Sequence, residues 1–505
     1  MIVKKLSIPA LALASLTTYD LFQKEHSILR TFPVVGHLRY AVESVGPELR
    51  QYIVTDNNTE RPFNRDQRRW IYASAKLENN YFGFGTDNVI DGTDGYPIIK
   101  TRTFSDLPAR PHTENAFLPS AKILGGPRGR RKAFRPTSVA NISAMSYGSL
   151  SAPAIESLNE GARLAGALHN TGEGGLSSHH RQGGDLVYQI GTGYFGCRTP
   201  GGEFSLPALL ETIADSPVRT IEIKLSQGAK PGLGGVLPAA KVTEEIARIR
   251  GIERGKDCVS PSRHTAFGDV DSLLDFVETI ADATGLPVGI KSAVGHLHFW
   301  DDLADAMADG SRGVDFITID GGDGGTGAAP LAFSDHVSHP LFTALPLVQK
   351  IFHERGIAEN ITWIASGRTG LPDRALMAFA LGADMVNVAR EAMLAIGCIQ
   401  AQRCHTGRCP TGVATQSTWL MRGVDPATKS GRTANYLTAL RRDLLKLSDA
   451  LAVAHPALAT TDDIDVLRAD GTFTTLTEAI GYEPGWGIPS ERDRSEITRI
   501  MYSPV

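Results

Sequence analysis

The chain has 505 residues, of which 42% are hydrophobic and 21% charged. This composition excludes a fibrous or disordered protein and allows one large barrel with appendages or two to three domains. A net charge of -4 gives no general field for nucleic acid, and five cysteines are too few for a disulfide scaffold, so we expect a reducing, cytoplasmic compartment without nucleic-acid partners.

The first segment, residues 1–115, carries helical patterns without a regular series of strands, which predicts an N-terminal helical extension. Its apolar start at residues 6–16 is similar to a short signal peptide. Pro9 and several polar residues interrupt this stretch, which is far shorter than the roughly 20 residues of a membrane span. We therefore expect a structural helix that stays on the chain, with membrane association of this segment as the alternative.

From residue 137 onward, short β-branched apolar runs alternate with longer helical stretches, a pattern typical of βαβ units. Eight such runs predict an α/β fold, a (β/α)₈ TIM barrel, over residues 116–430, followed by a helical tail at 431–505. The expected strands lie at 139–145, 167–170, 186–190, 220–225, 287–291, 314–320, 361–366 and 385–388.

Glycines recur where the expected strands end, for example at 172–175, Gly228, 321–325 and Gly367. In a barrel of this type the catalytic groups lie in the loops that follow the strands. An ordinary turn explains any one of these loops, but their recurrence at strand ends favours a ligand-binding face. A long insertion at 227–272, between the fourth and fifth strands, contains its own expected helix at 241–250.

Three cysteines lie within twelve residues after the last expected strand: Cys398, Cys404 and Cys409, the last of them followed by proline. Thiolates bind zinc or iron–sulfur clusters, and spaced cysteines ending in Cys-Pro are typical of cluster-binding loops. We expect a cluster loop at 398–409, and three local thiolates suit [3Fe-4S]. Zinc, buried free thiols and a disulfide are the alternatives, and a [4Fe-4S] cluster would need a fourth ligand such as Cys197 or Cys258.

Further motifs of the chain share their order and spacing with one enzyme family. In that order they resemble the FMN-binding synthase domain of the glutamate synthase family, over roughly residues 140–420. The motifs are Asn170-Thr-Gly-Glu173-Gly-Gly, Lys224-Leu-Ser-Gln227-Gly-Ala-Lys230, the segment 242–250, the glycine-rich run 320–330, and the cysteine run with its continuation at 412–416.

The resemblance implies FMN in the barrel beside a [3Fe-4S] cluster held by Cys398, Cys404 and Cys409. Ferredoxin or a similar donor would pass electrons through the cluster to FMN. A hydride would then reduce an imine of a 2-oxo acid, 2-iminoglutarate giving L-glutamate.

Five residues match family positions around the substrate and the flavin: Glu173, Lys224, Gln227, Lys230 and Arg250. Lys224, Gln227, Lys230 and Arg250 are the expected substrate-binding residues, because a dicarboxylate needs fixed cations and hydrogen-bonding groups. Glu173, Gln227 and Lys230 are the expected catalytic residues, with Glu173 orienting or protonating the nitrogen that is reduced. Solvated surface charge is the alternative interpretation.

The same resemblance indicates how FMN would be bound. Lys291 matches a position beside the flavin, where a cation stabilises negative charge on the reduced ring, although it is structural in the alternative interpretation. The phosphate is expected at the late barrel loops, where backbone N–H groups favour anions. The expected cofactor-binding residues are Met145, Ser146, Tyr147, Glu173, Lys291, Gly324, Gly325, Gly367, Arg368, Ala389 and Arg390.

The chain also departs from the family pattern. It begins Met1-Ile2-Val3, without the N-terminal cysteine of an amidotransferase domain, so ammonia or an amine would come from solvent or from a separate amidotransferase or other subunit. Leu233 and Val236 stand where acidic and amide residues are usual. The loss of an amide beside a polar ligand weakens the expectation of 2-oxoglutarate itself.

Three functions are therefore open. The first is a stand-alone glutamate-synthase-like reductase, and the second is an N-methylglutamate-type or other amine synthase or dehydrogenase component that works with partner subunits. The third is a flavin electron-transfer subunit without a small substrate. The joint presence of Glu173, Gln227, Lys230 and Arg250 argues against the third, and Val236 favours the second.

Two basic stretches predict where an acidic ferredoxin would dock: Arg403, His405 and Arg408 in the cluster loop, and the run 128–132. Solvated charge is the alternative. The chain lacks a Gly-x-Gly-x-x-Gly fingerprint after a strand, so direct NAD(P)H binding is not expected.

Overall fold

The computed structural model of the chain describes residues 2–56, 58–90, 92–110 and 116–503. The chain forms two compact units, which divide between Gln67 and Arg68. The helix α4 (Arg65–Lys76) crosses this division.

The N-terminal unit consists of α1 (Ile2–Phe22), α2 (Ser27–Thr31) and α3 (Gly36–Leu49), followed by a π-helical turn (Arg50–Val54). Within it, the buried carboxylate of Asp20 accepts hydrogen bonds from the backbone N–H of Val34 at 2.8 Å and from His37 Nε2 at 2.9 Å.

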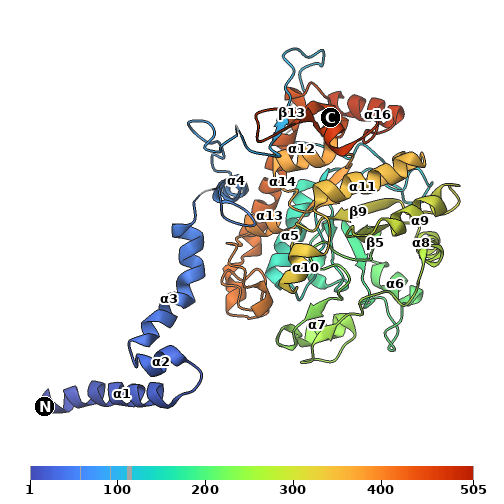
Figure 1. Cartoon of the computed structure of the whole chain (residues 1–505). Helices are drawn as coiled ribbons and strands as arrows, with labels where there is room; N and C mark the ends of the chain where they lie inside the picture. Colours follow the sequence, from blue (N-terminus) through green and yellow to red (C-terminus); the bar gives the residue numbers. More distant parts are fainter. Residues whose placement is uncertain (1, 57, 91, 111–115, 504–505) are drawn as a thin grey trace. The chain divides into compact units, whose positions relative to one another are not determined.

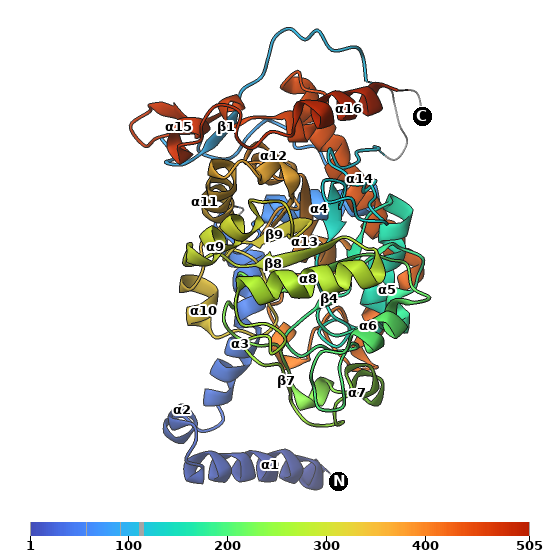
Figure 2. The same ribbon diagram turned by 90° about the vertical axis from the view of Figure 1, so that its right-hand side faces the viewer.

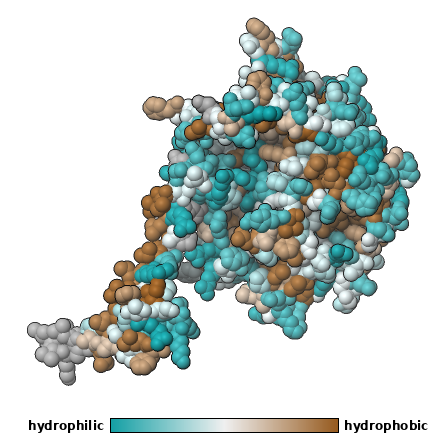
Figure 3. Space-filling view, in the orientation of Figure 1, coloured by the Kyte–Doolittle hydropathy of each residue, from teal (hydrophilic) through white to brown (hydrophobic). Residues whose placement is uncertain are grey.

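Exposed apolar side chains recur along these helices, including Leu13, Phe22, Phe32, Leu38 and Val42, and Figure 3 shows apolar residues along this unit. None of the helices in the described part of the chain has the length and apolar character needed to cross a membrane.

Eight parallel strands close into a barrel, which confirms the predicted (β/α)₈ fold (Figure 1). They follow the chain around the ring, and β11 pairs with β2 to close it. Most strand residues are buried, as expected for apolar runs covered on both faces. The strands are β2 (Ala140–Ile142), β3 (His169–Asn170), β4 (Leu186–Ile190), β5 (Val218–Lys224), β8 (Val288–Ser292), β9 (Phe316–Asp320), β10 (Thr362–Ser366) and β11 (Met385–Val388).

Helices cover the outside of the strands, as Figures 1 and 2 show. The longest, α14 (Pro426–Ala450), packs along α5 (Ala152–Ala165). The N-cap side chain of Ser151 starts α5 by accepting a hydrogen bond from the N–H of Ala154. The remaining helices around the barrel are α6 (Leu206–Ile213), α8 (Val270–Thr284), α9 (His298–Met307), α10 (Leu331–His336), α11 (Leu341–Glu354), α12 (Pro372–Ala380) and α13 (Arg390–Ala395).

The insertion at 227–272 has a fold of its own. A two-stranded antiparallel ribbon joins β6 (Val236–Leu237) to β7 (Cys258–Val259), and α7 (Glu244–Arg250) lies between them in the chain. This helix begins three residues after the predicted start at 241. Lys241 ends a 3₁₀ turn (Ala239–Lys241), and the Thr243 side chain caps α7 by accepting from the N–H of Ile246.

Two segments described as helical from the sequence also contain strands. β1 (Pro97–Ile99) pairs antiparallel with β12 (Ile464–Leu467), which pairs with β13 (Phe473–Thr475). These strands have three or four residues each, too few to produce a readable alternation, and their pairing joins segments distant in sequence. The helices α15 (Leu476–Ile480) and α16 (Glu491–Tyr502) complete the C-terminal region.

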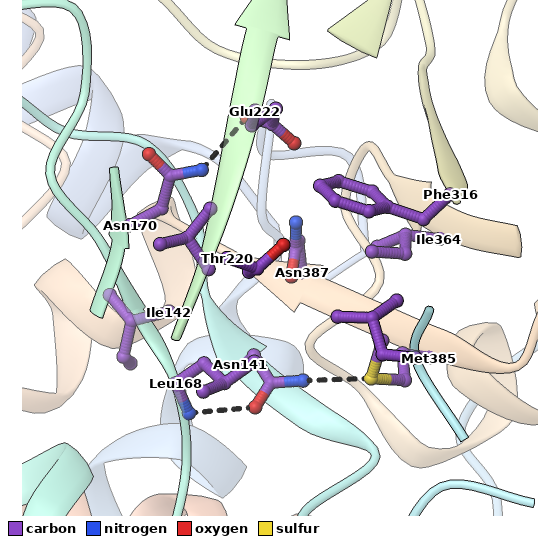
Figure 4. A pocket seen from close by; sticks show the side chains of 12 residues that line it. Asn141, Ile142, Leu168, Asn170, Thr220, Glu222, Phe316, Ile364, Met385 and Asn387 are labelled. Atoms are coloured by element: carbon purple, nitrogen blue, oxygen red, sulfur yellow. Dashed lines mark hydrogen bonds between the residues drawn. The ribbon is translucent and has the colours of Figure 1, made fainter. Parts of the chain in front are cut away.

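The barrel interior contains a small cavity with a polar network (Figure 4). The buried carboxylate of Glu222 on β5 accepts hydrogen bonds from Asn170 Nδ2 at 2.8 Å and Gln189 Nε2 at 2.6 Å, and its second oxygen accepts from Thr318 Oγ1 at 2.7 Å. A buried carboxylate with three donors is well satisfied, so this network fixes the register between β3, β4, β5 and β9.

The contact between α5 and α14 generates a stability prediction. A Cβ at Gly161 would overlap Thr433 Cβ and come within 2.8 Å of the Ser430 carbonyl oxygen. We expect Gly161→Ala to lower the free energy of unfolding by about 1–3 kcal/mol, despite the higher helix propensity of alanine. Gly431→Ala in α14, where nothing lies within 4 Å, is the matched control and should be neutral or slightly stabilising. Equal effects in denaturant titrations of the two variants would contradict the predicted packing.

Candidate active site

The C-terminal ends of the barrel strands bring together three of the predicted site residues. Lys224, the last residue of β5, donates from Nζ to Glu173 Oε1 at 2.7 Å and to Gln227 Oε1 at 2.8 Å. Glu173 comes from the loop after β3, and Gln227 starts the insertion. One ammonium group therefore orients an acid and an amide from two different loops.

Glycines surround the Glu173 carboxylate closely. A Cβ on Gly191 would lie 2.5 Å from Glu173 Oε2, and one on Gly235 would lie 2.9 Å from Oε1. Burial raises the pKa of Glu173. The positive charges of Lys224, Lys230 and Arg250 lower it by more than burial raises it, so the pKa of Glu173 lies below its usual value. Glu173 is therefore a carboxylate at neutral pH, able to orient or stabilise a cation.

Lys230 is buried beside this group. Its Nζ donates to the Gly234 carbonyl oxygen at 3.1 Å, within the same insertion. Burial lowers the pKa of Lys230, and repulsion from Lys224 lowers it further, whereas Glu173 raises it. Two lysines close to one carboxylate leave an excess of positive charge, which attracts an anionic ligand.

Arg250, at the end of α7, lies against the loop after β2. Its Nη2 donates to the Tyr147 carbonyl oxygen at 3.1 Å and to Ser146 Oγ at 3.4 Å, and its guanidinium stacks over the Phe195 ring at 5.2 Å. Its Nη1 approaches Cys258 Sγ at 3.6 Å. In this arrangement Arg250 anchors the segment 145–147, and its role in substrate binding stays a prediction.

The segment Met145–Tyr147 is fixed from several sides. Tyr147 Oη donates to Glu245 Oε2 of α7 at 2.7 Å, and Met145 and Tyr147 are buried. Gly172 packs against Ser146, where a Cβ would lie 2.6 Å from the backbone nitrogen, and its φ of +67° also favours glycine. The predicted flavin-facing segment thus lies next to the loop that carries Glu173.

Lys291, near the C-terminal end of β8, forms an ion pair with Asp320. Its Nζ lies 3.5 Å from Asp320 Oδ1. The other oxygen of Asp320 accepts from the N–H of Gly228 at 2.8 Å, and Oδ1 accepts from Ser366 Oγ at 2.6 Å. This network joins β8, β9 and β10 to the first residues of the insertion.

Three arginines gather around the loop after β9. Arg374 Nη2 lies 2.9 Å from Asp323 Oδ2, and Arg390 Nη2 donates to the Asp323 carbonyl oxygen at 2.5 Å. Burial lowers the pKa of Arg368, and Arg374 and Arg390 lower it further by repulsion. Arg374 also holds the Arg368 carbonyl oxygen through Nε at 2.8 Å. This arginine cluster of Arg368, Arg374 and Arg390 suits a phosphate.

Sequence reasoning missed Arg374 and Asp323. Arg374 belongs to the first turn of α12, directly after the loop of Gly367 and Arg368. This position beside the expected phosphate loop was the signal in the sequence that could have identified Arg374 as a site residue. Gly325 packs against Arg390, where a Cβ would come within 2.6 Å of Cδ, and the φ of +140° at Gly367 requires glycine. Gly324 and Ala389 belong to the same two loops.

The cysteine loop lies between α13 and α14. Tyr72 of α4 donates from Oη to the Cys398 carbonyl oxygen at 2.8 Å, and Cys404 Cβ lies 3.6 Å from where a Cβ on Gly327 would stand. All five cysteines of the chain are free thiols, which excludes the disulfide alternative in this structure. Within the described residues, no group of three or more His, Cys, Asp or Glu is close enough to coordinate a metal ion.

The three thiols nevertheless influence one another. Burial raises the pKa of Cys398 to about 12, with further contributions from Cys404 and Cys409. For Cys409, burial acts in the same direction, but hydrogen bonds from Ala414, Thr411 and neighbouring backbone groups hold its pKa below the usual value. The donors around Cys409 therefore favour a thiolate, the form that binds iron.

The two basic stretches differ in exposure. His405 and Arg408 are exposed in the cysteine loop. In the run 128–132, Arg130 is fixed by Glu278 at 2.6 Å and by Asp315 at 2.9 Å, and Arg128 also pairs with Glu278. Since two of its arginines already hold acids, the run 128–132 offers less free charge to a partner than the sequence indicates.

The pair of Glu173 and Lys224 generates a pH prediction. Because the folded pKa of Glu173 is lowered, its stabilising contribution is present above the unfolded pKa, about 4.3, and is lost as pH falls through the folded value. We expect Glu173→Gln to be less stable than the original protein by about 1–3 kcal/mol at pH 7. This difference should shrink as pH falls below about 4. Thermal unfolding from pH 7 to 3.5 measures it, and a difference independent of pH would contradict the assignment.

Comparisons with known proteins agree with this geometry. The model for the conserved region in glutamate synthase matches residues 128–454. The glutamate synthase large subunit-like protein YerD of Bacillus subtilis is 37% identical over 506 residues, covering 94% of this chain and 96% of that protein. The archaeal-type glutamate synthase [NADPH] of Thermotoga maritima is 35% identical over 349 residues, which cover 68% of this chain and 65% of that protein.

Among solved structures, one of mandelate oxidase is 16% identical, covers 70% of this chain and 82% of its own, and gives a TM-score of 0.39. That likeness is too distant to bear on function. The match of the conserved region over more than half of the chain, and the relative aligned over nearly its full length, decide the family. The chain belongs to the glutamate synthase family.

Proposed function

We propose that the protein is a flavin-dependent oxidoreductase that reduces the imine of a 2-oxo acid to an amino acid, 2-iminoglutarate to L-glutamate in the first instance. The observation that carries this proposal is the grouping of Glu173, Lys224, Gln227 and Lys230 at one end of the barrel. In a chain of this family, such a grouping can bind an anionic substrate and orient a nitrogen cation at one place.

FMN fits the residues at the same end of the barrel. The arginine cluster provides three guanidinium groups, which interact with the side-chain carboxylates of Asp320, Asp323, Asp373 and Glu391. Guanidinium groups are the donors that suit a phosphate. The segment Met145–Tyr147 and Lys291 would flank the ring. For the cluster, the type of donor fits, since Cys398, Cys404 and Cys409 are three interacting thiols on one loop, although they are not grouped closely enough among the described residues to bind a single metal ion. When bound, FMN supplies hydride transfer and a [3Fe-4S] cluster supplies one-electron transfer.

The residues of this chain would act on the substrate in distinct ways. The Lys230 ammonium would hold a carboxylate of the 2-oxo acid. The Glu173 carboxylate, fixed by Lys224, would accept a hydrogen bond from the protonated imine nitrogen and stabilise its charge. Gln227, fixed by the same lysine, keeps its amide N–H groups available to a substrate oxygen. The insertion that carries Gln227 and Lys230 would exclude water from the reacting imine.

A second candidate reaction uses an alkylated amine in place of ammonia, with partner subunits. Leu233 and Val236 expose 39% and 46% of their surface, and both lie next to Gly234 and Gly235, which contact Lys230 and Glu173. Apolar side chains at this place suit a substrate nitrogen that carries an alkyl group better than a nitrogen that carries only hydrogen atoms.

The donors of electrons and nitrogen are part of the same proposal. An acidic ferredoxin would dock near His405 and Arg408, and ammonia would come from solvent or from a separate amidotransferase in the cytoplasm. The relative from Thermotoga maritima is named for NADPH, which makes a second, pyridine-nucleotide-dependent protein another source of electrons. A flavin electron-transfer subunit without a substrate has no use for the grouping around Lys224.

The arginine cluster generates a prediction on FMN binding. Arg374→Met should weaken FMN binding by about tenfold or more, because a charge-assisted hydrogen bond to a phosphate contributes roughly 1.5–3 kcal/mol. Arg355→Met is the matched control, since Arg355 pairs with Asp301 and Asp305 on the helical surface. Fluorescence titration of the flavin-free proteins with FMN measures both affinities. An Arg374→Met protein that binds FMN like the control would contradict the phosphate site.

Substrate turnover tests the function itself. The reduced protein, mixed without oxygen with 2-oxoglutarate and ammonia, should show reoxidation of its flavin. Lys230→Ala should keep its FMN but slow this step by about 10- to 100-fold. Lys256→Ala, an exposed lysine of the same insertion, should not slow it. Reoxidation by 2-oxoglutarate with methylamine, but not with ammonia, would favour the second candidate. No reoxidation by any 2-oxo acid with either amine would refute imine reduction.

A further inference from the structure

Lys241 is a buried lysine that the proposed reaction does not use. It ends the 3₁₀ turn that precedes α7, inside the insertion that also carries Gln227 and Lys230. Its Nζ donates to the Cys404 carbonyl oxygen at 2.9 Å and to the Ala414 carbonyl oxygen at 3.4 Å. Both acceptors belong to the cysteine loop or its continuation.

These two contacts span the cysteine loop. Cys404 and Ala414 are ten residues apart, and Cys409 lies between them in the chain. Lys241 Cε also lies 3.6 Å from the position that a Cβ on Gly407 would take. One ammonium group therefore ties together the two sides of the loop around Cys409.

The far side of the loop is fastened to the barrel. Gln416 Nε2 donates to the carbonyl oxygens of Gly148 at 3.2 Å and Leu150 at 2.8 Å, and the N–H of Ser151 donates to the Val413 carbonyl oxygen at 2.9 Å. Because the Ala414 end is held in this way, the contacts of Lys241 fix the Cys404 end relative to the loop after β2.

Lys241 forms no ion pair with any described residue. Across the described residues, no carboxylate lies within ion-pair distance of its Nζ, and its two acceptors are neutral carbonyl groups. Burying an ammonium group without a counter-charge is costly. The thiols of Cys404 and Cys409 belong to the loop that Lys241 contacts, and they would be thiolates when they bind iron.

We propose that Lys241 is a positioning residue for an iron–sulfur cluster on the cysteine loop, where it holds the loop together and raises the reduction potential of the cluster. This inference rests on the cluster that the proposed function includes. A fixed cation beside the thiolates stabilises the reduced, more negative state more than the oxidised one. It also links the electron-receiving loop to the insertion that carries the substrate-binding lysine.

Three substitutions separate the charge from the hydrogen bonds. Lys241→Met removes both, Lys241→Gln keeps hydrogen-bond donors without the charge, and Lys241→Arg keeps the charge. Lys256→Met is the matched control, because Lys256 is an exposed lysine of the same insertion that pairs only with Glu253 among the described residues. Cys404→Ser reports whether iron is bound by this loop at all.

The full-length proteins, purified without oxygen, are analysed for iron and sulfide and titrated with reductant while the electron paramagnetic resonance of the cluster is followed. Lys241→Gln should keep its iron but shift the midpoint potential of the cluster downward. A tenfold change in the ratio of oxidised to reduced cluster corresponds to a shift of about 59 mV. Lys241→Met should shift it as well and lose part of its iron. Lys241→Arg and Lys256→Met should stay close to the original protein.

The possible failures are distinct. The cluster on this loop, and with it the role of Lys241, would be refuted if the unsubstituted protein contained no iron or if the Cys404→Ser protein kept its full iron content. A cluster that is lost in Cys404→Ser but keeps its content and potential in Lys241→Gln and Lys241→Met would overturn the role of Lys241 alone, and would leave the proposed cluster and reaction intact.

Discussion

The contact of the Lys224 ammonium group with Glu173 and Gln227 is the interaction on which the site depends. Lys224 is the last residue of a buried barrel strand, so its position is set by the packing of the barrel. The two groups that it holds come from separate loops, and neither would keep its orientation without the cation. A buried carboxylate without that cation would tend to take up a proton and lose the charge with which it can stabilise a substrate nitrogen.

The insertion at 227–272 is the part of the fold that contacts each of the neighbouring loops of the candidate site. It supplies Gln227 and Lys230 next to Glu173, fastens the loop after β2 through Arg250, and reaches the cysteine loop through Lys241. These contacts come from one stretch of chain with a small ribbon and one helix. A change in its position would therefore act on the group around Lys224 and on the cysteine loop together.

The sequence was sufficient to predict the barrel, because its strands are buried on both faces and read as short apolar runs separated by helices. The motifs at strand ends also indicated that Lys224, Glu173 and Gln227 belong to one site, and their side chains meet in the structure, whereas their roles stay a prediction. The sequence was insufficient for the small sheet of β1, β12 and β13, whose strands are short and pair across distant segments. Arg374 was missed because it lies in a helix, and the place of Arg250 against Tyr147 depends on packing that no local pattern reveals.

The most direct test of the account is the cofactor content of the protein purified without oxygen, measured as released flavin, iron and sulfide per chain. We expect one FMN and about three irons with the matching sulfide. A protein that contains no flavin, and that binds none when FMN is added, would contradict the central claim that the polar end of this barrel is a flavin site.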